Sequence, residues 1–165
     1  MSNRTVVDES SVAQFLSCGR LALVGASDDP KSFARTVSAE LTGHGYHVVP
    51  VNPAHHVVDG ETCYPSVSAV PGHVDGAILM TPSERSAEVA RDCVAAGVRN
   101  VWLFKGLGGG GATSDAAAAV CRENGVNLVD GACPLMFLEP VGWFHRVHHR
   151  ARQLRGTLTN RGGVG

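Results

Sequence analysis

Short apolar runs alternate with longer stretches of helical periodicity along most of the chain, and this alternation limits the possible folds more than any other feature. We expect strands at residues 21–24, 46–51, 74–80, 100–104 and 126–129. The stretches around them predict helices at 8–17, 32–42, 84–96 and 114–124. Strands separated by crossover helices run parallel. The sequence therefore predicts an α/β protein with a doubly wound, five-stranded parallel sheet and helices on both faces.

Composition agrees with one such domain and excludes several functional classes. Hydrophobic residues make up 44% of the 165 residues, which is enough for one core. Basic and acidic residues nearly balance, at 14 and 15, so a globally basic nucleic-acid binder is excluded. The apolar run at 74–80 is far shorter than the roughly 20 residues that cross a bilayer, and residues 1–10 lack the pattern of a secretory leader. We expect a cytoplasmic protein that binds neither nucleic acid nor membrane.

The cysteines show no pattern of a disulfide scaffold or a zinc site. No CxxC pair occurs in the chain. We expect reduced, mostly buried thiols. The five positions are Cys18, Cys63, Cys93, Cys121 and Cys133.

The loops that follow the predicted strands carry the candidate binding residues. Because the carboxyl ends of parallel strands meet at one edge of a sheet, these loops are expected to lie along that edge. Gly25 allows a tight turn before a helix whose first amides can bind phosphate, and Ser27 and Lys31 add a hydroxyl donor and a positive charge. The remaining loops are 50–53, 81–83, 105–107 and 131–134. We expect an irregular loop over 52–71, with at most a short helical turn.

The first loop departs from the fingerprint of NAD-binding Rossmann folds. That fingerprint, G-x-G-x-x-G, needs glycine where this chain has Ser27 and Pro30. The acidic residue that holds the NAD ribose is replaced by Asn52. A nucleotide bound without the NAD ribose clamp fits this Rossmann-like pattern better.

Several motifs together resemble those of the small CoA-binding proteins, whose Rossmann-like domain is similar to the CoA-binding domain of the succinyl-CoA synthetase alpha subunit. The resemblance covers nearly the whole domain. It rests on Val24-Gly25-Ala26-Ser27, Val49-Pro50-Val51-Asn52-Pro53, Gly60 with Tyr64-Pro65-Ser66, Val101-Trp102 with Gly106, and Cys133-Pro134.

The resemblance implies a role for each of these loops in binding CoA or an acyl-CoA. Ser27 and the helix start at Lys31 would hold phosphate, next to Gly25 and Ala26. Asn52 and Pro53 would flank the adenosine end, and Thr81 and Pro82 would line the nucleotide. Phe104, Lys105 and Gly106 would close over it. Relatives commonly carry a polar residue such as glutamine where Phe104 stands, so stacking or packing would replace a hydrogen bond there.

We expect binding without turnover. The synthetases use a phosphohistidine on another domain, and this chain supplies no such domain, so ligase activity is not expected. Two alternatives remain open at this point. Cys133 could act as the nucleophile of a thioester-processing enzyme, although no base is evident beside it. The chain could instead be a nucleotide-responsive regulatory or interaction module.

The C-terminal segment combines histidines with arginines. We expect residues 1–140 to form the binding domain and residues 141–165 to form a basic helix and a frayed tail. On a helix His145, His148 and His149 share one face, a spacing that can hold a metal. The surrounding arginines, with no acidic residue among them, favour a solvated basic face, so we expect no metal. This face suits an acidic protein partner, a second copy of the chain or the 3′-phosphate of CoA.

Residues Trp143, Val147 and Leu154 fall on one side of that helix, and we predict that they pack on the domain. Burying the tryptophan contributes about 2 to 3 kcal/mol. Deleting the residues after Pro140 should therefore lower the free energy of unfolding by about that amount, measured in urea, whereas replacing His148 and His149 by alanine should leave it unchanged. A stoichiometric metal that disappears in the double histidine variant would contradict the solvated-face interpretation.

Overall fold

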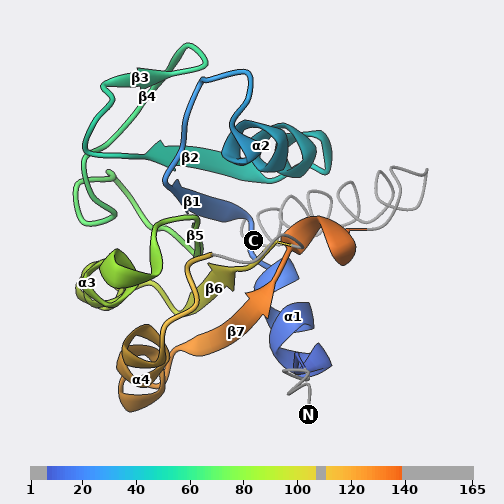
Figure 1. Cartoon of the computed structure of the whole chain (residues 1–165), viewed down its shortest axis with the longest axis vertical. Coiled ribbons are helices and arrows are strands. Elements are labelled where there is room, and N and C mark those ends of the chain that lie inside the picture. Colours follow the sequence, from blue (N-terminus) through green and yellow to red (C-terminus); the bar gives the residue numbers. More distant parts are fainter. Residues whose placement is uncertain (1–6, 107–110, 139–165) are drawn as a thin grey trace, which may run out of the picture.

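The computed structural model describes residues 7–106 and 111–138, and a five-stranded parallel sheet forms its centre (Figure 1). The strand order is β2-β1-β5-β6-β7. The chain leaves β1 toward β2 and returns on the other side of β1 at β5, so β1 and β5 flank the switch point of the sheet. The strands are β1 (Arg20–Val24), β2 (His47–Val51), β5 (Gly76–Leu79), β6 (Asn100–Phe104) and β7 (Asn127–Ala132). The predicted fold class is confirmed.

Helices cover both faces of the sheet, as predicted. On one face α1 (Glu9–Leu16) and α2 (Phe33–Gly43) pack on the sheet, and on the other α3 (Ser83–Ala95) and α4 (Asp115–Glu123) do so (Figure 1). Neighbouring residues of one strand serve opposite faces: Leu23 packs in the α1/α2 layer and Val24 in the α3/α4 layer. Two-sided burial explains why the strands are continuous apolar runs rather than alternating patterns.

The expected irregular loop at 52–71 contains a small antiparallel hairpin, so that part of the prediction is wrong. Strands β3 (Val57–Val58) and β4 (Glu61–Thr62) pair across a two-residue turn. Asp59 and Gly60 form this turn, with φ of 48° and 79°. An Asp-Gly pair is the residue combination that such turns favour.

The last strand continues beyond its predicted end at residue 129. A register shift at Leu103 and Phe104 lets β7 keep pairing with β6 as far as Ala132. Gly131 has a φ of 89°, which a residue with a side chain would adopt only with strain. Asp130 and Gly131 interrupt the apolar run, so the sequence pattern predicted an earlier end.

Trp102 fixes the segment that follows β7. Its buried indole Nε1 donates a 2.8 Å hydrogen bond to the carbonyl of Ala132. Its ring contacts Phe15 of α1 and Phe137 edge to face, with centroid distances of 5.2 and 5.7 Å. The short 3₁₀ helix η1 (Pro134–Met136) lies between Ala132 and Phe137 in the sequence.

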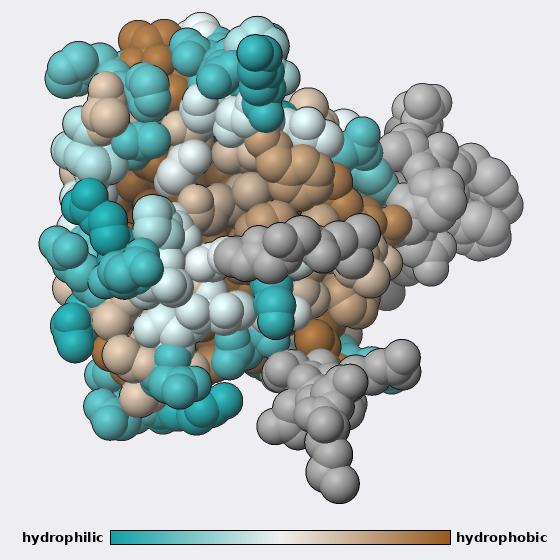
Figure 2. Space-filling model, in the orientation of Figure 1, coloured by the Kyte–Doolittle hydropathy of each residue, from teal (hydrophilic) through white to brown (hydrophobic). Residues whose placement is uncertain are grey.

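Hydrophobic surface is unevenly distributed. Figure 2 shows hydrophilic residues over the left side of this face and hydrophobic ones toward the middle and right. Two of the large exposed hydrophobic side chains, Phe33 and Met136, belong to α2 and η1, which contact each other. Within residues 7–106 and 111–138, no helix has the length and apolar character needed for a membrane crossing.

The expectations for the C-terminal segment lie outside the described residues. These are the domain boundary at residue 140, the packing of Trp143, Val147 and Leu154, and the face carrying His145, His148 and His149. They stay predictions.

Gly25, at the end of β1, should be irreplaceable. A Cβ atom there would lie 2.6 Å from the carbonyl oxygen of Met80, and its φ is 94°. Gly97 has a φ of 79° but open space around it, so it provides a matched control. We predict that Gly97→Ala costs about 1 to 2 kcal/mol of unfolding free energy through its backbone conformation alone. Gly25→Ala should cost clearly more, and equal losses in urea titrations would contradict the steric argument.

Candidate functional site

The candidate site is built on the end of β1, which is held between its two neighbouring strands. Gly25 N donates to the carbonyl of Val51 at 2.9 Å, and Met80 N donates to the carbonyl of Val24 at 2.8 Å. These bonds bring the loops after β1, β2 and β5 together at one edge of the sheet. A side chain on Gly25 would fill the space between them.

A cavity of about 580 Å³ opens at this edge, and we call it the strand-end cavity. It gathers residues from the three loops and from one face of α3. Five residues predicted from the sequence line it: Gly25, Asn52, Pro53, Thr81 and Pro82. The other lining residues are Val24, Val51, Pro65, Ser66, Met80, Arg85, Glu88, Val89 and Asp92. The cavity thus combines apolar side chains with a few charged groups, as ligand sites do.

Asn52 holds the loops in place. Its Nδ2 donates to the carbonyl of Ala26 at 3.0 Å, and its Oδ1 accepts from Ala54 N at 2.9 Å. Its backbone N–H donates to the carbonyl of Tyr64 at 2.9 Å. The amide side chain therefore ties the loop after β2 to the loop after β1.

The loop after β5 is fixed by hydroxyl groups. Thr81 Oγ1 and the buried Ser86 Oγ lie 3.2 Å apart, and Ser86 Oγ donates to the carbonyl of Pro82 at 3.3 Å. These contacts hold the first turn of α3 against the end of β5.

The α3 side of the cavity was not predicted from the sequence. Arg85, Glu88 and Asp92 recur at helical spacing and line it from one face of the helix. Asp92 accepts hydrogen bonds from Val67 N at 2.7 Å and from Ser68 Oγ, so it caps the neighbouring turn. The i, i+3, i+7 spacing was the available signal, but an exposed helix face usually carries such charges without a ligand.

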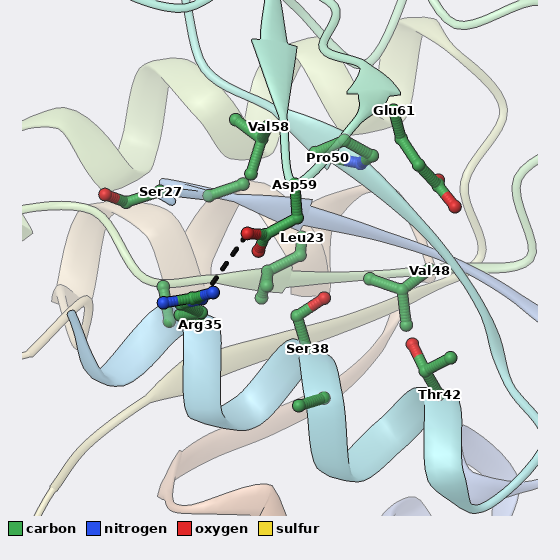
Figure 3. A pocket seen from close by; sticks show the side chains of 13 residues that line it. Leu23, Ser27, Arg35, Ser38, Thr42, Val48, Pro50, Val58, Asp59 and Glu61 are labelled. Atoms are coloured by element: carbon green, nitrogen blue, oxygen red, sulfur yellow. Dashed lines mark ion pairs between the residues drawn. The ribbon is translucent and has the colours of Figure 1, made fainter. Parts of the chain in front are cut away.

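Ala26 and Ser27 line a different cavity, of about 540 Å³, between α2 and the β3–β4 hairpin (Figure 3). Arg35 Nε of α2 lies 3.4 Å from Asp59 Oδ1 of the hairpin. Ser27 Oγ accepts from Asp29 N at 3.1 Å, which leaves its own proton free to donate. Lys31 is exposed and lines neither cavity.

The loop after β6 lies near the start of α2. The rings of Phe104 and Phe33 pack with centroids 5.6 Å apart, and Gly106 lies against the Phe104 ring. Lys105 lines a third, polar cavity of about 330 Å³ together with Asp115 and Asp130. Burial raises the pKa of Asp130, an effect that the positive charge of Arg122 opposes.

The cysteines are unpaired, as predicted, and four of the five are buried. Burial raises the pKa of Cys18 and of Cys121 to about 11, which keeps both as neutral thiols. Cys133 is the residue before η1, and it lines none of the three cavities described above.

No metal-binding cluster was found in the described residues. There, no three His, Cys, Asp or Glu side chains are arranged to hold an ion. The candidate His145, His148 and His149 lie outside that part of the chain.

The sequence of this chain is similar to parts of archaeal ADP-forming acetate–CoA ligases. The alpha subunit of an ADP-forming acetate–CoA ligase from Pyrococcus furiosus is 37% identical over 85 residues, which cover 51% of this chain and 19% of that subunit. An ADP-forming acetate–CoA ligase from Archaeoglobus fulgidus is 30% identical over 118 residues, 68% of this chain and 17% of that protein. The chain thus spans about a fifth of the length of these ligases.

One solved structure is similar to this chain over nearly the whole length of the solved protein. A hypothetical protein from Pyrococcus horikoshii OT3 superimposes with a TM-score of 0.73 at 26% identity, covering 82% of this chain and 93% of that one. The family of CoA binding domains matches residues 19–139, which include all five strands of the main sheet and every lining residue of the strand-end cavity. The chain belongs to this family of CoA binding domains.

Proposed function

We propose that the chain binds CoA or an acyl-CoA at the carboxyl edge of its parallel sheet and does not catalyse turnover. The observation that carries the proposal is the strand-end cavity, which lies at the sheet's switch point within the residues that match the CoA binding family. Ligands of open α/β sheets bind in such crevices.

In this proposal the nucleotide occupies the strand-end cavity, between the 52–53 loop and Thr81 with Pro82. The diphosphate faces Ser27 and the start of α2. Ser32, the residue before that helix, makes no side-chain capping hydrogen bond, so the first amides of α2 have no capping side chain as acceptor. The pantetheine arm continues toward Phe104, Lys105 and Gly106.

The chemistry of the cavity supports binding rather than turnover. Its lining contains no histidine, lysine or cysteine. Of its two carboxylates, that of Asp92 is hydrogen-bonded and that of Glu88 belongs to an exposed side chain. The archaeal ligases are proteins of which this chain covers about a fifth of the length. We extend the proposal to a second copy of the chain or an acidic protein as partner.

Calorimetric titration with CoA, acetyl-CoA, NAD and NADH tests the proposed function. We expect binding of CoA or acetyl-CoA and none of the NAD forms at the same concentrations. Micromolar binding of NAD with no response to CoA would sink the proposal. Thioester hydrolysis or acyl transfer that is lost in Cys133→Ala would show instead that the chain is an enzyme.

Lys31→Glu tests the position of the diphosphate. Reversing this charge beside the start of α2 should weaken CoA binding by about 1 to 3 kcal/mol, and added salt should reduce the difference. Arg99→Glu is the matched control, because Arg99 is also exposed but precedes β6 at the opposite edge of the sheet. Equal affinities of the two variants would remove Lys31 from the site.

A further inference from the structure

Helix α3 lines the strand-end cavity with charged side chains, two of which have no partner within the described residues. Arg85, Glu88 and Asp92 all line the cavity from this helix. Asp92 is occupied by the turn at Val67 and Ser68. Among the described residues, the side chains of Arg85 and Glu88 make no ion pair or hydrogen bond.

Arg85 is well placed to meet an anion. Its backbone N–H donates to the carbonyl of Pro82 at 3.0 Å, so the residue belongs to the first turn of α3, beside the Thr81–Pro82 loop. It is the only lysine or arginine among the residues that line this cavity. A planar guanidinium with free N–H groups matches the oxygens of a phosphate.

The proposed orientation of the ligand leaves one phosphate for Arg85. When the diphosphate on the ribose 5′ carbon faces Ser27 and α2, the 3′ carbon is free to face α3, on the other layer of the sheet. CoA carries a phosphate on that carbon, and dephospho-CoA carries a hydroxyl. We propose that Arg85 binds the ribose 3′-phosphate and makes the site selective for CoA over dephospho-CoA. This inference rests on the proposed function.

Glu88 should have the opposite effect to Arg85 on binding of the 3′-phosphate. Its exposed carboxylate lies one turn after Arg85 on the cavity side of α3 and lacks a partner in the described residues. Its negative charge repels a 3′-phosphate held by Arg85. Removing that charge should therefore strengthen binding of CoA and leave binding of dephospho-CoA unchanged.

The experiment is a set of calorimetric titrations of the full chain with CoA and with dephospho-CoA. Arg85→Gln should lower the affinity for CoA about tenfold, which corresponds to about 1.4 kcal/mol, and should change the affinity for dephospho-CoA less than about twofold. Glu88→Gln should raise the affinity for CoA only. Arg91→Gln is the matched control, since Arg91 is exposed on the same helix and does not line the cavity. All three positions are exposed, and an unchanged melting temperature checks that each variant is folded.

The outcomes separate the two proposals. A wild-type chain that binds CoA and dephospho-CoA equally, or an Arg85→Gln variant that weakens both ligands alike, would overturn the assignment of Arg85 and leave the proposed function standing. A wild-type chain that binds neither ligand would overturn the assignment of Arg85, and one that also fails to bind acetyl-CoA would overturn the proposed function.

Discussion

At the end of β1 the backbone of Gly25 comes so close to the carbonyl of Met80 that a Cβ atom would lie 2.6 Å from its oxygen. This contact occurs where the chain leaves β1 toward the α2 layer and leaves β5 toward the α3 layer. Because the two following segments diverge to opposite faces, they leave a crevice between them, which is the strand-end cavity. The cavity and the sheet register around it both depend on the absence of a side chain at residue 25.

Asn52 provides the second constraint on this edge. Both ends of its side-chain amide are hydrogen-bonded within the protein, to Ala26 and to Ala54. The residue is thus occupied in holding the loops in position before any ligand arrives. A site whose loops are already ordered loses less conformational entropy on binding. In the proposed site the groups that remain free, such as the Ser27 hydroxyl and the Arg85 guanidinium, are the ones available to contact the ligand.

Much of the fold was predictable because the strands of a parallel sheet buried on both faces are continuous apolar runs in the sequence. Strand β6 was predicted with its observed bounds, and α3 within one residue at each end. The β3–β4 hairpin was missed because its strands are only two residues long, too short for any periodicity, although Asp59-Gly60 signalled the turn. Arg85 was missed for a different reason. Its helical spacing with Glu88 and Asp92 is common on exposed helix faces that bind no ligand, and only the position of α3 beside the loops after β1 and β2 places it at the cavity.

The width of the sheet explains why the loops predicted to share one edge do not form one cavity. In the order β2-β1-β5-β6-β7, Asn52 follows the first strand and Phe104 is the last residue of the fourth. At the usual spacing of neighbouring strands, their ends are about 14 Å apart. The residues accordingly divide among the strand-end cavity, the cavity beneath the hairpin and the polar cavity at Lys105. A nucleoside alone fills only the first of these, whereas a ligand that contacts both Asn52 and the Phe104 loop must extend along the strand ends. CoA has that shape, since its pantetheine arm continues from the diphosphate away from the adenosine. The separation of these loops is therefore a reason to favour a long, flexible cofactor over a mononucleotide at this edge.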